Sequence, residues 1–485
     1  MAVENKKSLK LNMVLNMLRG FLGAVFPLIT FPYVTRVLGV ENIGMFNFAN
    51  SVVSYFVLLA GLGINTYAIR EGSHLREDRG KLEKFLAEVF SINILSTMVA
   101  YVLMIAIIMT APQLRSYTTL ILILSSQIAF KTIGVEWLYT IYEEYAYITI
   151  RTIIFQFISL ILMFLLVRKP SDVAMYAIAT VMATVGSNLL NFVHAKKYCR
   201  LSVKWKINWK KHFKSIMILF ATAVTVTVYV SSDTTILGLI CGDYEIGIYT
   251  VSVKVYTVLK TVFSSAIVVA IPRMAKLAGE NSMLEFAKLG NYIYKTFISF
   301  IFPAILGVII LREQIVLILS GPDYITAQSS LALLSVALFF CLGAGFWSQA
   351  VMIPLNMENR VFGITVVSAV VNIVLNFFTV SIWQENAAAL TTVIAECLVL
   401  IYCWYQSRGQ IDMQGVFKTI LKSFLGCLPM VAIAYFVRLI FSNIIIVTVF
   451  TVVFCVVEYT TVELILKNEI IGGYVSSIKQ KLKYN

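Results

Sequence analysis

Two long apolar runs of the sequence each contain a cation, Arg19 in one and Lys254 in the other. A charged side chain at the centre of a membrane helix costs about 2.5–3.5 kcal/mol in apparent insertion energy, so its presence indicates a functional partner. Guanidinium and ammonium groups form their strongest hydrogen bonds with carboxylates and phosphates. We therefore expect Arg19 and Lys254 to bind an anionic ligand that carries phosphate.

Each cation shares a helical face with small polar residues, because positions three or four apart lie on one side of a helix. Four stripes follow this spacing: Asn12, Asn16, Arg19, Gly23 and Thr30; Asn47, Ser51, Ser54, Gly61 and Asn65; Thr222, Thr225, Tyr229 and Ser232, with Asp233 alongside; and Thr250, Lys254, Thr257, Thr261 and Ser264. A hydrated cleft lined by the four helices that carry these stripes accounts for all four stripes together. We expect it to bind phosphates and sugar hydroxyls through Arg19, Lys254, Asn16, Asn47, Asn50, Ser51, Ser54, Thr257 and Asp233.

Each of these residues also has a plainer interpretation. Ser, Thr and Asn form ordinary hydrogen bonds between helices in many membrane bundles. Arg19 is close enough to the inner surface to extend its head group there. Asp233 either pairs with Lys254 or caps the end of its own helix, and Lys260, off the Lys254 stripe, either faces the cleft or reaches the inner interface.

Two prolines, Pro27 and Pro32, fall in the first apolar run. Each removes a backbone donor and should bend the helix. A bent helix that carries Arg19 is a candidate gate, and a static kink is the alternative.

The elements that must position these residues are membrane-spanning helices. Of the 485 residues, 59% are hydrophobic and 13% are charged, against about 45–50% and 25% in soluble domains. One crossing takes about 20 apolar residues, and with connections of about a dozen residues the chain holds about 14 transmembrane helices. This leaves no room for a soluble catalytic domain. We place them near 11–35, 43–69, 85–110, 117–138, 147–167, 173–194, 215–240, 246–270, 292–311, 328–354, 361–383, 387–405, 423–441 and 444–466.

The distribution of Lys and Arg predicts the orientation, since cations are retained on the cytoplasmic side. With both termini inside, most of the 39 cations fall in inner segments, including the connection 131–151. The outer connections carry Arg36, Arg115, Arg168, Lys169, Arg312 and Arg438, and Arg19, Lys254 and Lys260 remain within spans. This bias also explains the net charge of +14 without a nucleic-acid partner.

An internal repeat suggests the domain organisation. Ile43-Gly44 aligns with Ile246-Gly247 at an offset of 203 residues, which is also about six spans. We expect a six-helix lobe over 1–200, a basic interfacial linker on anionic lipid over 201–214, a second six-helix lobe over 215–405, and two further spans and a cytoplasmic tail over 406–485. An even number of spans per lobe makes the repeat parallel, with its axis along the membrane normal.

Several classes of function are disfavoured by what the sequence lacks. It contains no GxxxxGK[ST] loop for nucleotide phosphates and no Gly-x-Ser-x-Gly element. Its three histidines have no metal spacing, and its seven cysteines form no CxxC motif. We expect no metal, no cofactor, no disulfide framework and no enzymatic activity.

The N-terminal ninety residues resemble a known family. The match runs through Leu18-Arg19-Gly20, Phe31-Pro32-Tyr33-Val34-Thr35-Arg36-Val37-Leu38-Gly39, Gly44-Met45-Phe46-Asn47-Phe48-Ala49-Asn50-Ser51, Gly61-Leu62-Gly63-Ile64, Arg70-Glu71 and Arg76-Glu77-Asp78-Arg79-Gly80-Lys81-Leu82. These segments resemble the polysaccharide-transporter flippases of O-antigen, capsule and teichoic type, within the multidrug/oligosaccharidyl-lipid/polysaccharide exporter superfamily. The resemblance implies two six-helix lobes in a V, a cationic central cavity and alternating access.

The same resemblance implies a bacterial plasma-membrane flippase for surface polysaccharide biosynthesis. Its substrate would be undecaprenyl-diphosphate-linked oligosaccharide repeat units, moved from the inner to the outer leaflet, and its candidate protein partners are a polysaccharide polymerase and a chain-length regulator. A lipid II flippase is the nearest alternative, and a non-transporting scaffold of a polysaccharide assembly complex is an alternative of another class. A multidrug antiporter fits less well, because it would be expected to have twelve spans and membrane acids for cation coupling.

Overall fold

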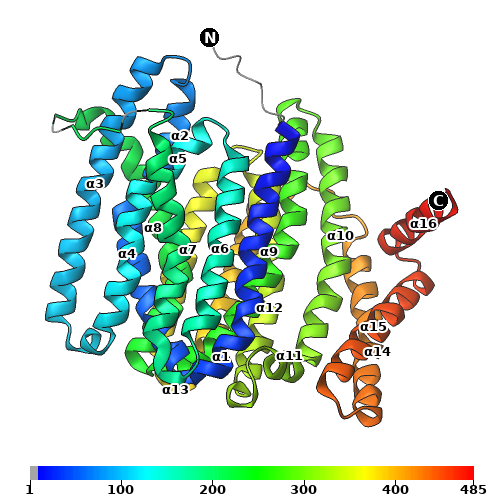
Figure 1. The fold of residues 1–485 in the computed structure, drawn as a ribbon. Coiled ribbons are helices and arrows are strands. Elements are labelled where there is room, and N and C mark those ends of the chain that lie inside the picture. The colour runs from blue at the N-terminus through cyan, green and yellow to red at the C-terminus, as the bar shows by residue number, and fades with distance from the viewer. Residues whose placement is uncertain (1–8, 200, 205, 485) are drawn as a thin grey trace. The chain divides into compact units, whose positions relative to one another are not determined.

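The structure is a computed structural model that describes residues 9–199, 201–204 and 206–484. Some side chains in the terminal helices, including those of Asn16 and Arg19, lie outside the described part. All regular secondary structure in these ranges is helical (Figure 1). The predicted all-α membrane fold is confirmed.

The chain forms two compact units, residues 1–250 and 251–485. The first contains α1 (Leu9–Gly61), α2 (Ile64–His74), α3 (Arg79–Thr110), α4 (Thr118–Gly134), α5 (Glu136–Ile141), α6 (Tyr145–Leu166), α7 (Val173–Ala195), α8 (Trp209–Ile240) and the start of α9 (Asp243–Gly279). The second continues α9 and adds α10 (Met283–Ile310), α11 (Arg312–Leu319), α12 (Ala327–Gly345), α13 (Glu358–Gln406), α14 (Val416–Ile440), α15 (Ile444–Ile465) and α16 (Glu469–Tyr484). The predicted division into lobes, linker and C-terminal spans stays a prediction.

Two of the long helices are interrupted where the sequence separates predicted spans. Gly39 in α1 has φ 77° and ψ 173°, between the spans predicted at 11–35 and 43–69. Gln384 in α13 has φ 49° and ψ −130°, between those predicted at 361–383 and 387–405. Each helix therefore consists of two arms, and the arms of α1 can be followed in Figure 1.

Eleven helices in the described part are long and apolar enough to cross a membrane. This set counts α13 as one helix and omits α4, which has 17 residues. The count of fourteen crossings and the cytoplasmic position of both termini stay predictions.

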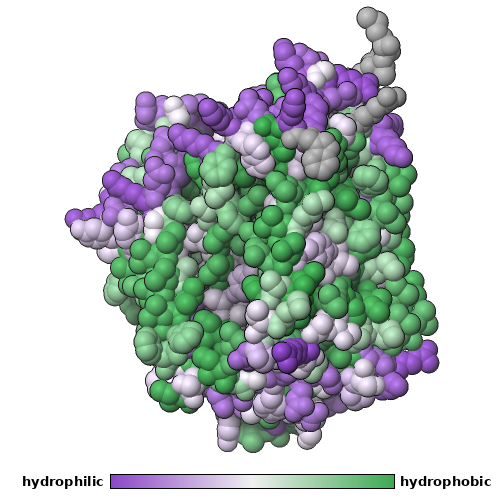
Figure 2. Space-filling model, turned by 90° about the vertical axis from the view of Figure 1, so that its left-hand side faces the viewer, coloured by the Kyte–Doolittle hydropathy of each residue, from purple (hydrophilic) through white to green (hydrophobic). Residues whose placement is uncertain are grey.

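The surface carries the apolar band that a lipid bilayer requires. Figure 2 shows one face on which hydrophobic residues cover a broad band and hydrophilic residues gather at its two ends. Large exposed apolar side chains such as Val102 and Met109 on α3 and Phe378 on α13 belong to such lipid-facing surfaces. Since each span bonds its own backbone, helices meet the condition that hydrocarbon imposes.

In the first unit, α1 packs against α3, α4, α6 and α8. Val34, Leu38 and Ile43, around the Gly39 break, are buried together with Met163 on α6 and Ala179 on α7. A second cluster, which includes Tyr67, Phe85 and Trp137, joins α2, α3 and α5. The helices that carry polar side chains are thus held by apolar contacts on both sides of the polar region.

In the second unit, α12 and α13 form an extensive helix pair against α10. Its core contains Phe297, Leu342, Phe346 and Trp347. The last two spans, α14 and α15, pack side by side (Figure 1). Cys427, Met430, Cys455 and Tyr459 are buried between them.

The two repeated glycines contact each other's segment reciprocally. A Cβ added to Gly44 would overlap the backbone carbonyl of Asp243, and one added to Gly247 would overlap that of Val40. Positions 40 and 243, like 44 and 247, are related by the same offset of 203 residues. Reciprocal contact of equivalent positions is the pattern of a local two-fold relation, and it supports the alignment from which the repeat was inferred.

We predict that Gly44→Ala and Gly247→Ala each destabilise the protein. A methyl group at either position must displace backbone, and such overpacking costs about 1–3 kcal/mol. Thermal unfolding of the detergent-purified protein measures the effect as a lowered Tm. The control is Gly363→Ala in α13, where an added Cβ has no atom within 4 Å. If all three variants had the same Tm, the close contact would be disproved.

Candidate functional site

The first unit encloses a polar cavity of about 440 Å³. It lies between the second arm of α1 and helices α2 to α7. Its polar lining combines two bases, one acid, amides and hydroxyls: Lys131, Arg151, Glu136, Asn65, Asn93, Gln156, Asn188, Thr132, Thr152, Thr184 and Ser187. A cavity of this composition inside a membrane bundle is suited to a ligand with several polar groups.

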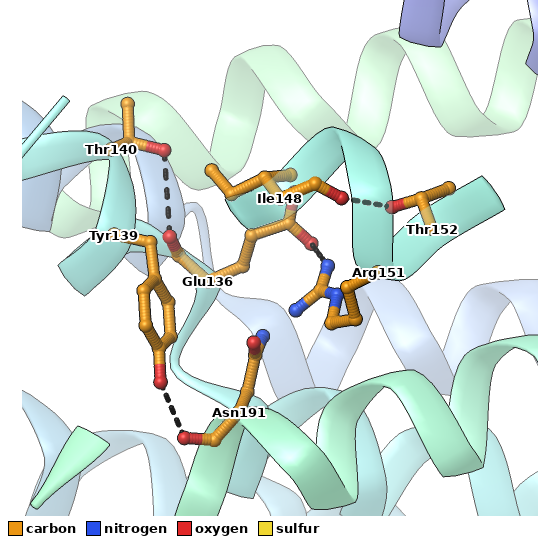
Figure 3. Close-up of polar contacts among 7 residues, drawn as sticks. All are labelled: Glu136, Tyr139, Thr140, Ile148, Arg151, Thr152 and Asn191. Atoms are coloured by element: carbon orange, nitrogen blue, oxygen red, sulfur yellow. Dashed lines mark hydrogen bonds and ion pairs between the residues drawn. The ribbon is translucent and has the colours of Figure 1, made fainter. Parts of the chain in front are cut away.

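Arg151 on α6 is the most buried charge in this lining, with 4% of its side chain exposed. Its Nη2 lies 3.9 Å from Oε2 of Glu136 (Figure 3). Its guanidinium carbon lies 5.9 Å from the centre of the Tyr147 ring, within the range of a cation–π contact. The helix and the ring hold the guanidinium, and the carboxylate supplies the opposite charge.

Glu136 enters the cavity through a break in the chain between α4 and α5. Helix α4 ends at Gly134 and α5 begins at Glu136, while Val135 between them has φ 39° and ψ 46°. A β-branched residue in this left-handed region is strained. Gly134 allows close approach of α7, since an added Cβ would overlap the side chain of Asn188. The break thus directs a carboxylate toward Arg151 instead of continuing the helix.

Aromatic side chains beside the cavity hold the helices that carry Glu136 and Arg151. The rings of Tyr139 and His194 are stacked at 15°, and the Tyr147 ring lies 4.4 Å from that of His194. The Tyr139 hydroxyl donates to the backbone carbonyl of Asn191 (Figure 3). These contacts join α5, α6 and α7, so the helices that carry Glu136 and Arg151 are held in register.

Two amide side chains near Arg151 have hydrogen-bonding capacity left over. Asn191 is fully buried, and neither its Oδ1 nor its Nδ2 has a partner among the described residues. Its side chain points toward the Glu136–Arg151 pair in Figure 3. Oε1 of Gln156 is buried and also has no partner in the described part. Buried polar groups are normally hydrogen-bonded. Of the two amides, Gln156 belongs to the described lining of the cavity and Asn191 does not.

The chain matches the family model described as polysaccharide biosynthesis protein over residues 9–278, which is more than half of its length. The chain belongs to this family. The resemblance predicted from the N-terminal residues is therefore confirmed. The match covers all the helices that line the cavity.

The chain is also similar to a putative O-antigen transporter and to a capsular polysaccharide biosynthesis protein. The chain is 22% identical over 401 residues to the putative O-antigen transporter of Escherichia coli (strain K12), covering 81% of this chain and 95% of that protein. It is 24% identical over 376 residues to the capsular polysaccharide biosynthesis protein CapF of Staphylococcus aureus, covering 75% and 90%. With its apolar helices, the chain is a multi-pass protein of the bacterial inner membrane and belongs among transporters rather than enzymes.

Solved structures share the fold. Lipid II flippase MurJ in an inward closed conformation superimposes with a TM-score of 0.78 at 16% identity, covering 95% of this chain and all of that one. A multidrug resistance MATE family transporter of the MOP superfamily, in an inward-facing conformation, gives a TM-score of 0.58 at 13% identity, covering 84% and 96%. At these identities the likeness concerns the fold alone.

The predicted site residues of the second stripe engage α8. Oγ of Ser54 lies 3.1 Å from Oγ of Ser231, and Thr235 donates to Oγ of Ser51 over 3.1 Å. Asn47 donates to the carbonyl of Ile43 in its own helix. These bonds agree with the helix-packing interpretation of the stripe, while its last two members, Gly61 and Asn65, do line the cavity.

The remaining predicted residues are distributed over both units. Asn50 is exposed on α1, and Asp233 on α8 is buried and accepts a hydrogen bond from the Tyr249 hydroxyl over 3.1 Å. In the second unit, Lys254 on α9 is half-buried and Thr257 is exposed. The described site residues from the prediction do not line the 440 Å³ cavity, and their roles stay predictions.

Prolines 27 and 32 lie within α1, whose described helical break is at Gly39. The hydroxyl of Thr30 donates to the carbonyl of Pro27, and Nη1 of Arg36 donates to that of Pro32. The gating role of the prolines stays a prediction.

Lys260, for which two orientations were open, is placed beside an acid. Its Nζ lies 3.9 Å from Oε1 of Glu396 on α13 and 5.6 Å from the centre of the Tyr256 ring. The second unit thus contains its own combination of base, acid and tyrosine.

Lys131 and Arg151 were missed because both border the connection 131–151, which the charge distribution assigns to the cytoplasmic side. A signal for them was present in the next two spans. Polar residues recur at helical spacing in α6 at Thr149, Thr152, Gln156 and Ser159, and in α7 at Thr180, Thr184, Ser187, Asn188 and Asn191. A search of these spans for polar stripes would have indicated the cavity.

We predict that the cavity is hydrated and attracts anions. In a cysteine-free background, Thr152→Cys should react with charged methanethiosulfonate reagents, and faster with a sulfonate than with a trimethylammonium reagent. Ile154→Cys, on the exposed face of the same helix, should react at least about tenfold more slowly, because a thiolate and a charged reagent are both excluded from hydrocarbon.

The measurement is the labelling rate by mass spectrometry of protein in nanodiscs. Equal rates at positions 152 and 154, or faster reaction with the cationic reagent, would contradict the assignment. Among the native cysteines, Cys199 should contribute little background labelling, because burial raises the pKa of its thiol to about 11.

Proposed function

We propose that the chain translocates undecaprenyl-diphosphate-linked oligosaccharide repeat units from the inner to the outer leaflet of the bacterial plasma membrane. The observation that carries this proposal is the polar cavity lined by Arg151 and Lys131 in a member of the polysaccharide biosynthesis protein family. The names of the Escherichia coli and Staphylococcus aureus relatives, O-antigen transporter and capsular polysaccharide biosynthesis protein, support polysaccharide precursors as the substrate class.

The chemistry of the cavity fits the head group of such a lipid. A diphosphate cannot enter a bilayer without partners, because a dehydrated anion needs charge-assisted hydrogen bonds. Lys131 and Arg151 provide cations, with Glu136 as the one acid in the described lining. The amides of Asn65, Asn93, Gln156 and Asn188 and the neighbouring hydroxyls are suited to sugar hydroxyls.

The residues predicted from sequence extend this site in the proposal. Thr149 on α6 donates a hydrogen bond to the carbonyl of Leu15, so the turn of α1 just before Asn16 packs beside the turn that carries Arg151. Arg19 and Lys254 are proposed as further diphosphate ligands. Asn16, Asn47, Asn50, Ser51, Ser54, Thr257 and Asp233 are proposed to line the substrate path, with Pro27 and Pro32 at its gate.

In the proposed cycle, the cavity opens alternately to the two sides of the membrane. The head group crosses while its charge stays paired with protein cations, and the lipid tail remains in the bilayer. Chemical bonds are neither made nor broken, so no cofactor is required. The polymerase and the chain-length regulator are the candidate protein partners on the outer side.

A lipid II flippase is the second candidate, because MurJ shares the fold over nearly the whole chain. Lipid II and the oligosaccharide intermediates both present a diphosphate joined to sugar, so the cavity chemistry suits either. Complementation separates them: we expect the chain to restore surface polysaccharide in a strain that lacks its O-antigen or capsule flippase, and not to restore growth after depletion of the lipid II flippase.

We predict that Arg151→Gln and Lys131→Gln each slow translocation by about 10- to 100-fold, because a hydrogen bond to a charged group contributes about 1.5–3 kcal/mol. The assay follows a fluorescent lipid-linked oligosaccharide in proteoliposomes by quenching from outside. Arg70→Gln is the matched control, since Arg70 is half exposed beside Glu71 outside the cavity.

Arg19→Ala and Lys254→Ala should also slow translocation if they bind the diphosphate. Label that stays in its starting leaflet with the unmodified protein would indicate the scaffold alternative. Normal rates in both Arg151→Gln and Lys131→Gln would disprove the role of the cavity.

A further inference from the structure

The ion pair in the cavity is loose compared with a second pair in the same unit. Nη2 of Arg151 and Oε2 of Glu136 are 3.9 Å apart, whereas Nη1 of Arg76 and Oε1 of Glu143 are 3.1 Å apart and hydrogen-bonded. Charge-assisted hydrogen bonds between nitrogen and oxygen measure about 2.7–2.9 Å. Glu136 therefore neutralises Arg151 through space without engaging the guanidinium as a tight bidentate partner.

The two members of this pair differ in how firmly they are held. Arg151 is 4% exposed and rests against the Tyr147 ring, whereas the Glu136 side chain is 35% exposed. Glu136 also follows the strained Val135 at the junction of two helices, where small backbone rotations re-aim the side chain. Arg151 is thus held firmly in the lining of the cavity, whereas the more exposed Glu136 side chain can change its orientation.

From this asymmetry we propose that Glu136 is a displaceable counter-ion, which occupies Arg151 in the empty cavity and is exchanged there for a phosphate group of the ligand. The inference rests on the proposed function and assigns a part of the site to the diphosphate. In both states of the exchange an anion faces the guanidinium of Arg151, which compensates its charge in a low dielectric.

The exchange also limits affinity, which a transporter needs in order to release its substrate. A carboxylate tethered beside the guanidinium competes with every anion that enters. Lys131, five residues before Glu136 and in the same lining, is a cation toward which the displaced carboxylate can turn. The site should therefore bind phosphate more weakly than the same site without the acid.

The test compares anion affinity in Glu136→Gln and the unmodified protein. Isothermal titration in nanodiscs uses two probes, geranylgeranyl diphosphate and inorganic pyrophosphate, with geranylgeraniol as the uncharged control. We expect Glu136→Gln to bind both anions about 5- to 150-fold more tightly, the range typical of coupling between two binding interactions in one protein. It should also flip substrate more slowly, because release is impaired. Geranylgeraniol should bind both proteins equally.

Two further variants locate the effect. Glu136→Gln combined with Arg151→Gln should lose the gain in affinity, because the gain depends on the guanidinium. Glu143→Gln removes the acid of the tighter pair at the same end of the unit and should leave anion affinity unchanged. If Glu136→Gln does not fold, Glu136→Asp keeps the charge on a shorter side chain and should still tighten binding, by less.

If Glu136 had only a structural role, Glu136→Gln would weaken anion binding, because loss of the acid would disorder Arg151. Unchanged or weaker affinity for pyrophosphate in Glu136→Gln overturns the proposal. Tighter binding of pyrophosphate upholds it even if no oligosaccharide is flipped, whereas failure of the proposed function would appear as absence of flipping by the unmodified protein.

Discussion

A charge inside hydrocarbon must be compensated by the protein that carries it, and this constraint shapes both units. In the first, Arg151 has Glu136 and the ring of Tyr147 beside it. In the second, Lys260 has Glu396 and the ring of Tyr256. The two sets come from different helices, α5 and α6 in the first unit and α9 and α13 in the second, so the same physical requirement has been met twice by different residues.

The same constraint explains where the chain departs from regular helix. Non-helical backbone at membrane depth is tolerated where it is buried in protein or lines a polar cavity. The break at Val135 adjoins the cavity. Because the helix does not continue through it, the carboxylate of Glu136 faces Arg151. The irregularity and the buried arginine are therefore parts of one arrangement.

Much of the fold could be predicted from sequence, because a membrane span is a long local signal. The break at Gly39 falls in the gap between two predicted spans, and the apolar runs correspond to the observed helices. The functional site was harder to predict from sequence. Ser51 and Ser54 show the right spacing for a polar face, but spacing does not distinguish a face that meets ligand from one that meets α8.

Arg151 illustrates the opposite error. Its position at the start of a span made it resemble a topology signal, and its burial depends on how α6 packs against α1, α5 and α7, which sequence spacing does not encode. Glu136 could be recognised as a membrane carboxylate, but its partner could not, because a backbone break re-aims its side chain. Long-range packing and irregular backbone are the two features that separate the predicted site from the observed cavity.

The reciprocal contact of Gly44 with Asp243 and of Gly247 with Val40 also limits which substitutions the chain can accept. Most positions of a helix tolerate a new side chain because the neighbouring side chains can adjust. Where two turns touch backbone to backbone, no side chain can adjust, so a substitution at either glycine disturbs both turns. The two glycines are therefore constrained as a pair, and a change at one cannot be relieved by a change of side chain at the other.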